Sequence, residues 1–355
     1  MKNDKPIRVL VVDDSAIVRK ILVDALSGER DIEVVGTASD PYIARDQIVA
    51  LRPDVLTLDI ELPRMDGLTF LKKLMQYHPM PVIIISSLAQ ASCHAALEAL
   101  RLGAVEAVGK PAGPYSMGDL RQTLAAKVRA AAASTPGKLR AGLSPPFAPD
   151  SKPPLSKLPA TALPSARLIA MGASTGGVSA LQHVLTELPE DLPGIVITQH
   201  IPENFSRAFA ARLDKLCRVT VKEAEDGDVV LRGHAYIAPG NRHLIIQKCS
   251  RGYALSIKDG PQVCYQRPSV DVLFHSAAQA AGASAVGVLL TGMGADGASG
   301  LLAMKKAGAH TIAQDEASCV VFGMPKEAIA RGAVLEVRSL AEVGTAIQAA
   351  LVSRH

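Results

Sequence analysis

The chain has 355 residues, of which 48% are hydrophobic and 20% charged, an ordinary balance for a globular protein that builds two or three buried cores. The net charge is +4, but residues 130–167 hold five basic residues and one acidic residue, so that segment carries the whole excess. With 3% aromatic residues and no Trp, the composition disfavours nucleic-acid binding.

The sequence also lacks the usual signals for membrane insertion and secretion. No apolar run approaches the roughly 18 residues that span a bilayer. Asp13 and Asp14 interrupt the short apolar run near the N-terminus, which argues against a signal peptide. We therefore expect a cytoplasmic protein without membrane insertion. The five cysteines include no C-x-x-C pair, so neither a zinc site nor a disulfide framework is predicted.

Residues 1–129 alternate apolar, strand-like runs with helix-like segments. The predicted strands cover 7–12, 32–38, 54–60, 81–87 and 104–110. The predicted helices cover 16–27, 41–50, 67–77, 91–102 and 117–130. Five strand–helix units of this size predict an α/β domain with a doubly wound parallel sheet of the flavodoxin-like type.

Ligands of such sheets lie beyond the carboxyl ends of the strands, and that edge gathers chemically active residues here. Asp13, Asp14 and Asp59 follow two of the strands, and such a cluster of carboxylates favours a bound Mg²⁺. Asp59 ends the middle strand and can attack a phosphoryl donor to form an acyl phosphate. Ser86 and Lys110 end the next two strands and are predicted to contact the phosphoryl oxygens. The structural alternative for any single aspartate is a helix cap.

The stretches "VLVVDDS", "LDIELPRMDGL", "IIISS" and "GKP" resemble the receiver domain of two-component response regulators. The resemblance covers residues 7–129. It implies that a histidine kinase phosphorylates Asp59, with Mg²⁺ held by Asp13, Asp14, Asp59 and the backbone carbonyl of Glu61. One position departs from the family pattern, because Ala107 stands where receivers usually carry an aromatic switch residue.

Residues 130–167 change character. Eight prolines stand among Ser, Ala and Gly in this segment. Proline fixes φ and removes backbone donors, so a semi-extended linker is predicted rather than a packed element.

Residues 168–355 begin a second alternating pattern, which predicts a second α/β domain with a mostly parallel sheet. The predicted strands cover 168–173, 194–199, 218–224, 285–291 and 310–314. The predicted helices cover 176–187, 204–216, 269–281, 297–307, 325–331 and 339–352. Residues 234–259 are predicted to form a hairpin-like excursion around Arg251-Gly252.

The turn "GASTGG" after the first of these strands has the G-x-S-x-G pattern from Gly172 to Gly176. It lacks the second glycine of a dinucleotide fingerprint and the G-K-[ST] of a phosphate-binding loop. Small residues here allow a sharp strand-to-helix turn that presents Ser174 as a nucleophile. A catalytic serine needs a base and a group that orients the base.

Two further residues end strands at the same predicted edge. His200 ends "GIVITQH" and is the candidate base, although a lone histidine is more often structural. Asp296 follows "LLTGMGA" and is the candidate acid, although it could instead cap the helix that it begins. The convergence of Ser174, His200 and Asp296 predicts a serine hydrolase that needs no metal or cofactor for its chemistry.

The stretches "GASTGG", "QHIPENFS", "RPSVDVLFHSAA", "TGMGADGA" and "IAQDEASCVVFGMPKEAI" resemble the catalytic domain of the CheB protein-glutamate methylesterases. The family's triad falls on Ser174, His200 and Asp296. The resemblance implies hydrolysis of glutamate methyl esters on methyl-accepting chemoreceptors, with deamidation of receptor glutamines. Backbone amides of Met293 and Thr175 are expected to receive the oxyanion.

A receiver joined to an esterase suggests that phosphorylation of Asp59 exposes Ser174 by shifting the contact between the domains. Two other classes stay open at this point. A non-enzymatic response regulator would carry a helix-turn-helix output, and a nucleotide-binding output would carry the missing glycine pattern. A receptor array outside chemotaxis is a further alternative for the substrate.

Overall fold

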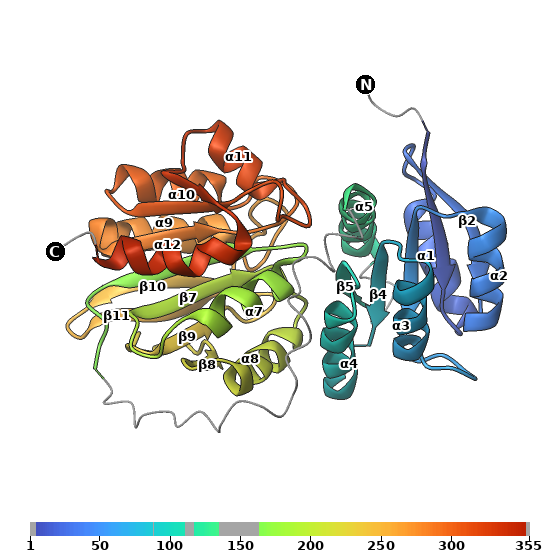
Figure 1. Ribbon diagram of the computed structural model, residues 1–355, viewed down its shortest axis with the longest axis horizontal. Helices are drawn as coiled ribbons and strands as arrows, with labels where there is room; N and C mark the ends of the chain where they lie inside the picture. The colour runs from blue at the N-terminus through green and yellow to red at the C-terminus, as the bar shows by residue number, and fades with distance from the viewer. Residues whose placement is uncertain (1–4, 88, 111–116, 135–162, 353–355) are drawn as a thin grey trace. The chain divides into compact units, whose positions relative to one another are not determined.

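The computed structural model describes residues 5–87, 89–110, 117–134 and 163–352, which belong to two compact units. Each unit contains its own parallel sheet with helices packed around it (Figure 1). Both units are α/β, as predicted.

The first unit is a five-stranded sheet with the order β2-β1-β3-β4-β5, in which every pair is parallel. Its strands are β1 (Ile7–Val12), β2 (Ile32–Ala38), β3 (Val55–Asp59), β4 (Val82–Ser86) and β5 (Glu106–Gly109). Its helices are α1 (Ala16–Leu26), α2 (Pro41–Leu51), α3 (Gly67–Tyr77), α4 (Gln90–Arg101) and α5 (Met117–Ala133). The predicted doubly wound order is confirmed, and element ends differ from the prediction by a few residues.

The sequence explains these elements locally. Strands β3 and β4 are buried along their whole length, as expected of central strands that helices cover on both faces. Ser15, Asp40 and Asp66 cap α1, α2 and α3, because each side chain accepts a hydrogen bond from an amide of the first turn. Helix α1 packs beside α5, and α3 packs beside α4 (Figure 1).

The segment between the two sheets is described only at its ends. Helix α5 continues to Ala133, and strand β6 (Leu168–Ala173) begins the second sheet. The predicted linker, 130–167, therefore overlaps the last turn of α5, and most of it lies in 135–162, outside the described residues.

The second unit contains a seven-stranded sheet with the order β14-β13-β12-β6-β7-β9-β8, and all pairs within it are parallel. Its strands besides β6 are β7 (Gly194–Gln199), β8 (Thr220–Glu223), β9 (His234–Ile237), β12 (Ala285–Leu289), β13 (His310–Gln314) and β14 (Glu336–Arg338). Strands β6, β7 and β12 are buried throughout and form its centre.

Six α-helices are described in this unit: α7 (Gly177–Glu187), α8 (Phe205–Leu216), α9 (Val270–Ala281), α10 (Ala298–Lys306), α11 (Met324–Ala330) and α12 (Leu340–Val352). Helix α7 packs beside α8 and α12, whereas α10 packs beside α9 and α11 (Figure 1). None of the helices in the described part of the chain has the length and apolarity that a membrane span requires.

The prediction for residues 234–259 was wrong in one part. The antiparallel hairpin consists of β10 (His243–Cys249) and β11 (Gly252–Lys258), as the Arg251-Gly252 turn indicated. Residues 234–237 instead form β9, which lies between β7 and β8 in the main sheet. The prediction also missed β14. Strands β9 and β14 have only four and three residues, which is too short to show a clear apolar pattern.

Candidate active site

Ser174 lies in a tight turn between β6 and α7. Gly176 has a φ of 78°, and a Cβ on it would come within 2.6 Å of the Val320 side chain, so this position requires glycine. The Ser174 amide donates to the Thr291 carbonyl (3.0 Å), and the Ser174 carbonyl accepts from Gly177 N–H (2.7 Å). These backbone bonds fix the direction in which the serine hydroxyl points.

The order of the central strands brings three of the predicted residues together. Strand β6 lies between β7 and β12, so Ser174 is flanked by the residues that follow those two strands. His200 Nδ1 lies 2.9 Å from Ser174 Oγ. His200 Nε2 lies 2.7 Å from Asp296 Oδ2. The three side chains are all at least nine-tenths buried and form one continuous hydrogen-bonded chain.

The hydrogen-bond partners assign the tautomer of His200. The Asp296 carboxylate can only accept, so Nε2 carries the proton, and Nδ1 is left as the acceptor for the serine O–H. The ring nitrogen near the backbone thus faces the nucleophile, the reverse of the chymotrypsin-like arrangement.

Asp296 accepts four hydrogen bonds. Besides His200, its donors are the Ser269 hydroxyl (2.8 Å) and the amides of Val270 (2.8 Å) and Asp271 (2.9 Å). Burial alone would raise the pKa of Asp296, but the hydrogen bond from His200 and the donors from α9 hold it below its usual value. The acid is therefore an ionised carboxylate at neutral pH.

The contacts of Asp296 correct the alternative reading of this residue as the cap of its own helix. The N-cap of helix α10 is Gly297, not Asp296, and a glycine has no side chain with which to cap the helix. The carboxylate instead lies at the N-terminus of α9, where the first amides and the helix dipole favour a negative charge. Sequence spacing could not reveal this, because α9 precedes Asp296 by more than a dozen residues.

The two expected oxyanion residues lie on either side of Ser174. Thr175 directly follows it, and its carbonyl accepts a hydrogen bond from Thr291 Oγ1 (3.0 Å). Met293 follows Gly292, which packs against the serine turn. The Met293 amide donates no hydrogen bond to the described part of the chain.

Three residues without a predicted role support the site. Thr291 bonds the serine turn and the Val321 backbone, and Gln199 Nε2 donates to the Ser174 carbonyl (2.9 Å). Ser269 caps α9 and donates to Asp296. Ser269 directly precedes an apolar helical run, which is the usual sequence signal of a cap. Nothing in the sequence links that cap to Asp296.

Close packing at Gly292 leads to a stability prediction. A Cβ there would lie 2.7 Å from Ser174 Cβ and 2.3 Å from Met324 Sδ. We expect Gly292→Ala to destabilise the second unit by about 1–3 kcal/mol, because backbone and side chains must move apart, and to lower esterase activity. Denaturant unfolding of the full chain measures this. Gly344→Ala in α12, where the nearest atom would be 3.7 Å away, is the matched control and should not lower stability, because alanine favours a helix over glycine by about 0.5–1 kcal/mol.

The acidic cluster of the first unit lies at the carboxyl edge of its sheet. One carboxylate oxygen from each of Asp13, Asp14 and Asp59 lies within 4.8 Å of the others. Lys110 Nζ lies 2.6 Å from Asp59 Oδ2 and 3.1 Å from Asp13 Oδ2. Burial is the main reason that the pKa values of Asp13 and Asp59 are raised, because it takes the charged carboxylates out of water.

These residues fit a divalent cation. Asp13 Oδ2 is buried and accepts no hydrogen bond from the described residues, although the Lys110 ammonium lies near it. All the side-chain ligands are hard oxygens, as Mg²⁺ prefers. Glu61 follows Asp59 by two residues, and its amide donates to Asp59 Oδ1 (3.2 Å).

Within the described residues, Ser86 makes no hydrogen bond to the aspartates of the cluster. It ends β4, and its hydroxyl donates to the carbonyls of Ser92 (3.2 Å) and Ser87 (3.3 Å). Ala107 is buried in β5, where an aromatic switch side chain is absent.

Fold and site together are those of a response regulator whose output domain is an α/β hydrolase. The family model "CheB methylesterase" matches residues 169–347, and the model "Response regulator receiver domain" matches residues 9–124. The chain belongs to the CheB protein-glutamate methylesterase family.

Similar proteins cover nearly the whole chain. A protein-glutamate methylesterase/protein-glutamine glutaminase of Syntrophus aciditrophicus is 54% identical over 96% of this chain and 98% of its own. The Escherichia coli K12 protein of that name is 53% identical over 95% of both. The crystal structure of the Thermotoga maritima CheB methylesterase catalytic domain is 37% identical and covers 52% of this chain and 97% of its own, with a TM-score of 0.50.

Proposed function

We propose that this protein removes methyl groups from glutamate methyl esters of chemoreceptors, deamidates receptor glutamines, and is activated by phosphorylation of Asp59. The hydrogen-bonded chain from Ser174 through His200 to Asp296 carries the proposal. Sequence similarity also supports it. This chain is more than 50% identical, over nearly the full length, to proteins that are named for both activities.

The proposed reaction is acyl transfer to Ser174. The hydroxyl oxygen attacks the ester carbonyl while His200 Nδ1 takes its proton. Asp296 holds the imidazolium through Nε2. The tetrahedral oxyanion accepts hydrogen bonds from the amides of Met293 and Thr175.

The intermediate then collapses, and His200 returns the proton to the leaving methoxide, so methanol departs. A water molecule, deprotonated by the same nitrogen, attacks the acyl-enzyme and releases the glutamate carboxylate and Ser174. With glutamine as substrate the leaving group is ammonia, and the remaining steps are the same.

In the receiver we assign Asp59 as the phosphoryl acceptor. Asp13, Asp14, Asp59 and the carbonyl of Glu61 would hold Mg²⁺, which when bound neutralises charge on the phosphoryl group. Lys110 and Ser86 would contact the phosphoryl oxygens. The phosphodonor would be a chemotaxis histidine kinase, and the substrates would be methyl-accepting receptors.

The domain boundaries of the proposal are those expected from the sequence. We place the receiver over 1–129, with its last helix running on to Ala133, the catalytic domain over 168–355, and the linker within 130–167. The proposed place of action is the cytoplasm, where both the kinase and the modified receptor segments would be reached.

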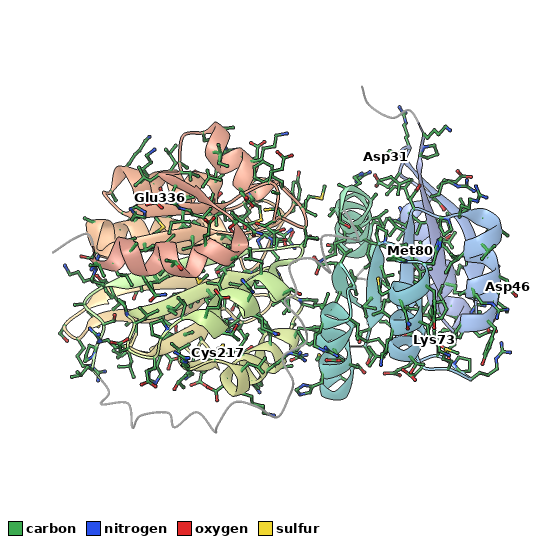
Figure 2. The ribbon with its side chains drawn as sticks, in the orientation of Figure 1. Asp31, Asp46, Lys73, Met80, Cys217 and Glu336 are labelled. Atoms are coloured by element: carbon green, nitrogen blue, oxygen red, sulfur yellow. The ribbon has the colours of Figure 1, made fainter. Side chains whose placement is uncertain are left out.

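The regulatory half is tested by methanol release from methylated receptor membranes with and without a small phosphodonor and Mg²⁺. The wild-type protein should be stimulated, whereas Asp59→Asn should keep its basal rate and lose all stimulation, because an amide cannot form the acyl phosphate. Asp46→Asn is the control, since Asp46 is an exposed carboxylate on α2 (Figure 2). Full stimulation of Asp59→Asn would contradict the assignment.

A further inference from the structure

His243 is a buried histidine that takes no part in the proposed reaction. It begins β10, and only 5% of its surface is exposed. Its Nδ1 lies 3.2 Å from the Ser269 amide nitrogen, and its Nε2 lies 2.9 Å from the Pro261 carbonyl oxygen. Both ring nitrogens are therefore engaged with backbone groups.

These two partners assign a single form of the ring. An amide N–H can only donate, so Nδ1 must present a lone pair to Ser269. A carbonyl can only accept, so Nε2 must carry the proton that is donated to Pro261. His243 is thus a neutral imidazole, and a proton on Nδ1 would place one N–H against another.

The hydrogen bond between His243 and Ser269 matters because Ser269, the N-cap of α9, also contacts Asp296. Ser269 is fully buried, its hydroxyl donates to Asp296 Oδ1 (2.8 Å), and it accepts from the Val272 amide. The next two amides, of Val270 and Asp271, donate to the same carboxylate. The position of Ser269 therefore sets three of the four hydrogen bonds that orient Asp296.

We propose that His243 is a positioning residue of the hydrolytic site. Through its unprotonated Nδ1 it holds the Ser269 backbone, and through Ser269 and the start of α9 it holds Asp296 against His200. This inference rests on the proposed function, and it adds a residue that lies two contacts away from Asp296.

Two substitutions of similar shape test the two hydrogen bonds of the His243 ring one at a time. His243→Asn keeps an acceptor near the Nδ1 position, whereas His243→Gln places its amide near the Nε2 position and leaves Ser269 N–H without an acceptor. We expect His243→Gln to lower kcat about 10- to 100-fold with KM changed less than about twofold, because the reacting groups lose their alignment. His243→Asn should stay within about threefold of the wild-type kcat.

Ser276→Ala is the matched control for a purely structural role. Ser276 Oγ accepts a hydrogen bond from the Ile246 amide (3.0 Å), so it also joins α9 to β10, but two turns beyond Ser269. It makes no hydrogen bond to the site in the described chain. We expect Ser276→Ala to lower thermal stability and to keep kcat.

The decisive readout is the rate at which a fluorophosphonate labels Ser174 in the full-length chain, with phosphodonor and Mg²⁺ present. This rate depends on His200 and Asp296 but not on any receptor, so it tests the inference even if methylated receptors prove to be the wrong substrate. Slow labelling of His243→Gln with near-normal labelling of His243→Asn and Ser276→Ala is the expected result. Equal labelling of the two His243 variants, or equal slowing by Ser276→Ala, would overturn the inference.

Discussion

Replacing Ser174 by alanine is expected to lower methanol release from methylated receptors at least about 10⁴-fold, because the nucleophile is lost and only the oxyanion donors and substrate binding remain. Stability should change little, since within the described residues the hydroxyl makes one hydrogen bond, to His200 Nδ1. Methanol release measured at saturating substrate with phosphodonor present gives kcat, and ammonia release from receptor glutamines should fall in parallel.

The control for this variant is Ser250→Ala in the turn between β10 and β11, where the serine is exposed. It should keep the wild-type rate. A Ser174→Ala protein that retains release within about tenfold of the wild type would show that another group is the nucleophile, and the output domain would then have to be considered a binding module.

Asp296→Asn is expected to have the second largest effect, because it damages both the triad and α9. An asparagine offers one acceptor oxygen where the carboxylate offers two, so its NH₂ must face either His200 and Val270 or Ser269 and Asp271. In either orientation two donors are left without an acceptor. We expect kcat to fall about 10³- to 10⁴-fold and the unit to lose about 1–3 kcal/mol of stability.

The pH dependence of stability provides a second measurement. Because the pKa of Asp296 is depressed in the folded protein, its stabilising contribution is complete above the ordinary aspartate pKa and is lost as pH falls through the folded-state value. The stability difference between wild type and Asp296→Asn should therefore narrow in acid. Thermal unfolding of both proteins from pH 7 downward measures it.

Asp226→Asn is the matched control for Asp296→Asn. Asp226 also accepts from a hydroxyl and an amide, those of Ser256 and Ile257, but through one oxygen, which an asparagine retains. Its kcat and stability should stay close to those of the wild type. If Asp226→Asn lost as much stability as Asp296→Asn, the loss could not be attributed to the α9 terminus.

Most of the fold could be predicted because its strands are long and buried. Continuous apolar runs such as Leu168–Ala173 and Gly194–Gln199 identify central parallel strands, and capping residues mark where several helices begin. The edge of the second sheet could not be predicted in the same way. β9 and β14 owe their strand conformation to pairing with β7, β8 and β13, which is a tertiary effect that local sequence does not report.

The candidate site likewise has one part that the sequence predicts and another that only tertiary contacts determine. That Ser174, His200 and Asp296 follow strands of one sheet could be predicted from topology, because carboxyl ends of parallel strands share an edge. The use of Nδ1 toward the serine, and of the α9 terminus toward the acid, depends on side-chain directions and on contacts between residues far apart in sequence. Such contacts have no local signature.

The separation of the site residues along the chain also bears on how the protein folds. Ser174 and His200 are 26 residues apart, and His200 and Asp296 are 96 apart, while every strand pair of the main sheet is parallel and needs a crossover. Contacts of this kind raise the contact order and close late in folding. A partly folded chain thus has no assembled triad, so hydrolytic activity reports the completed sheet.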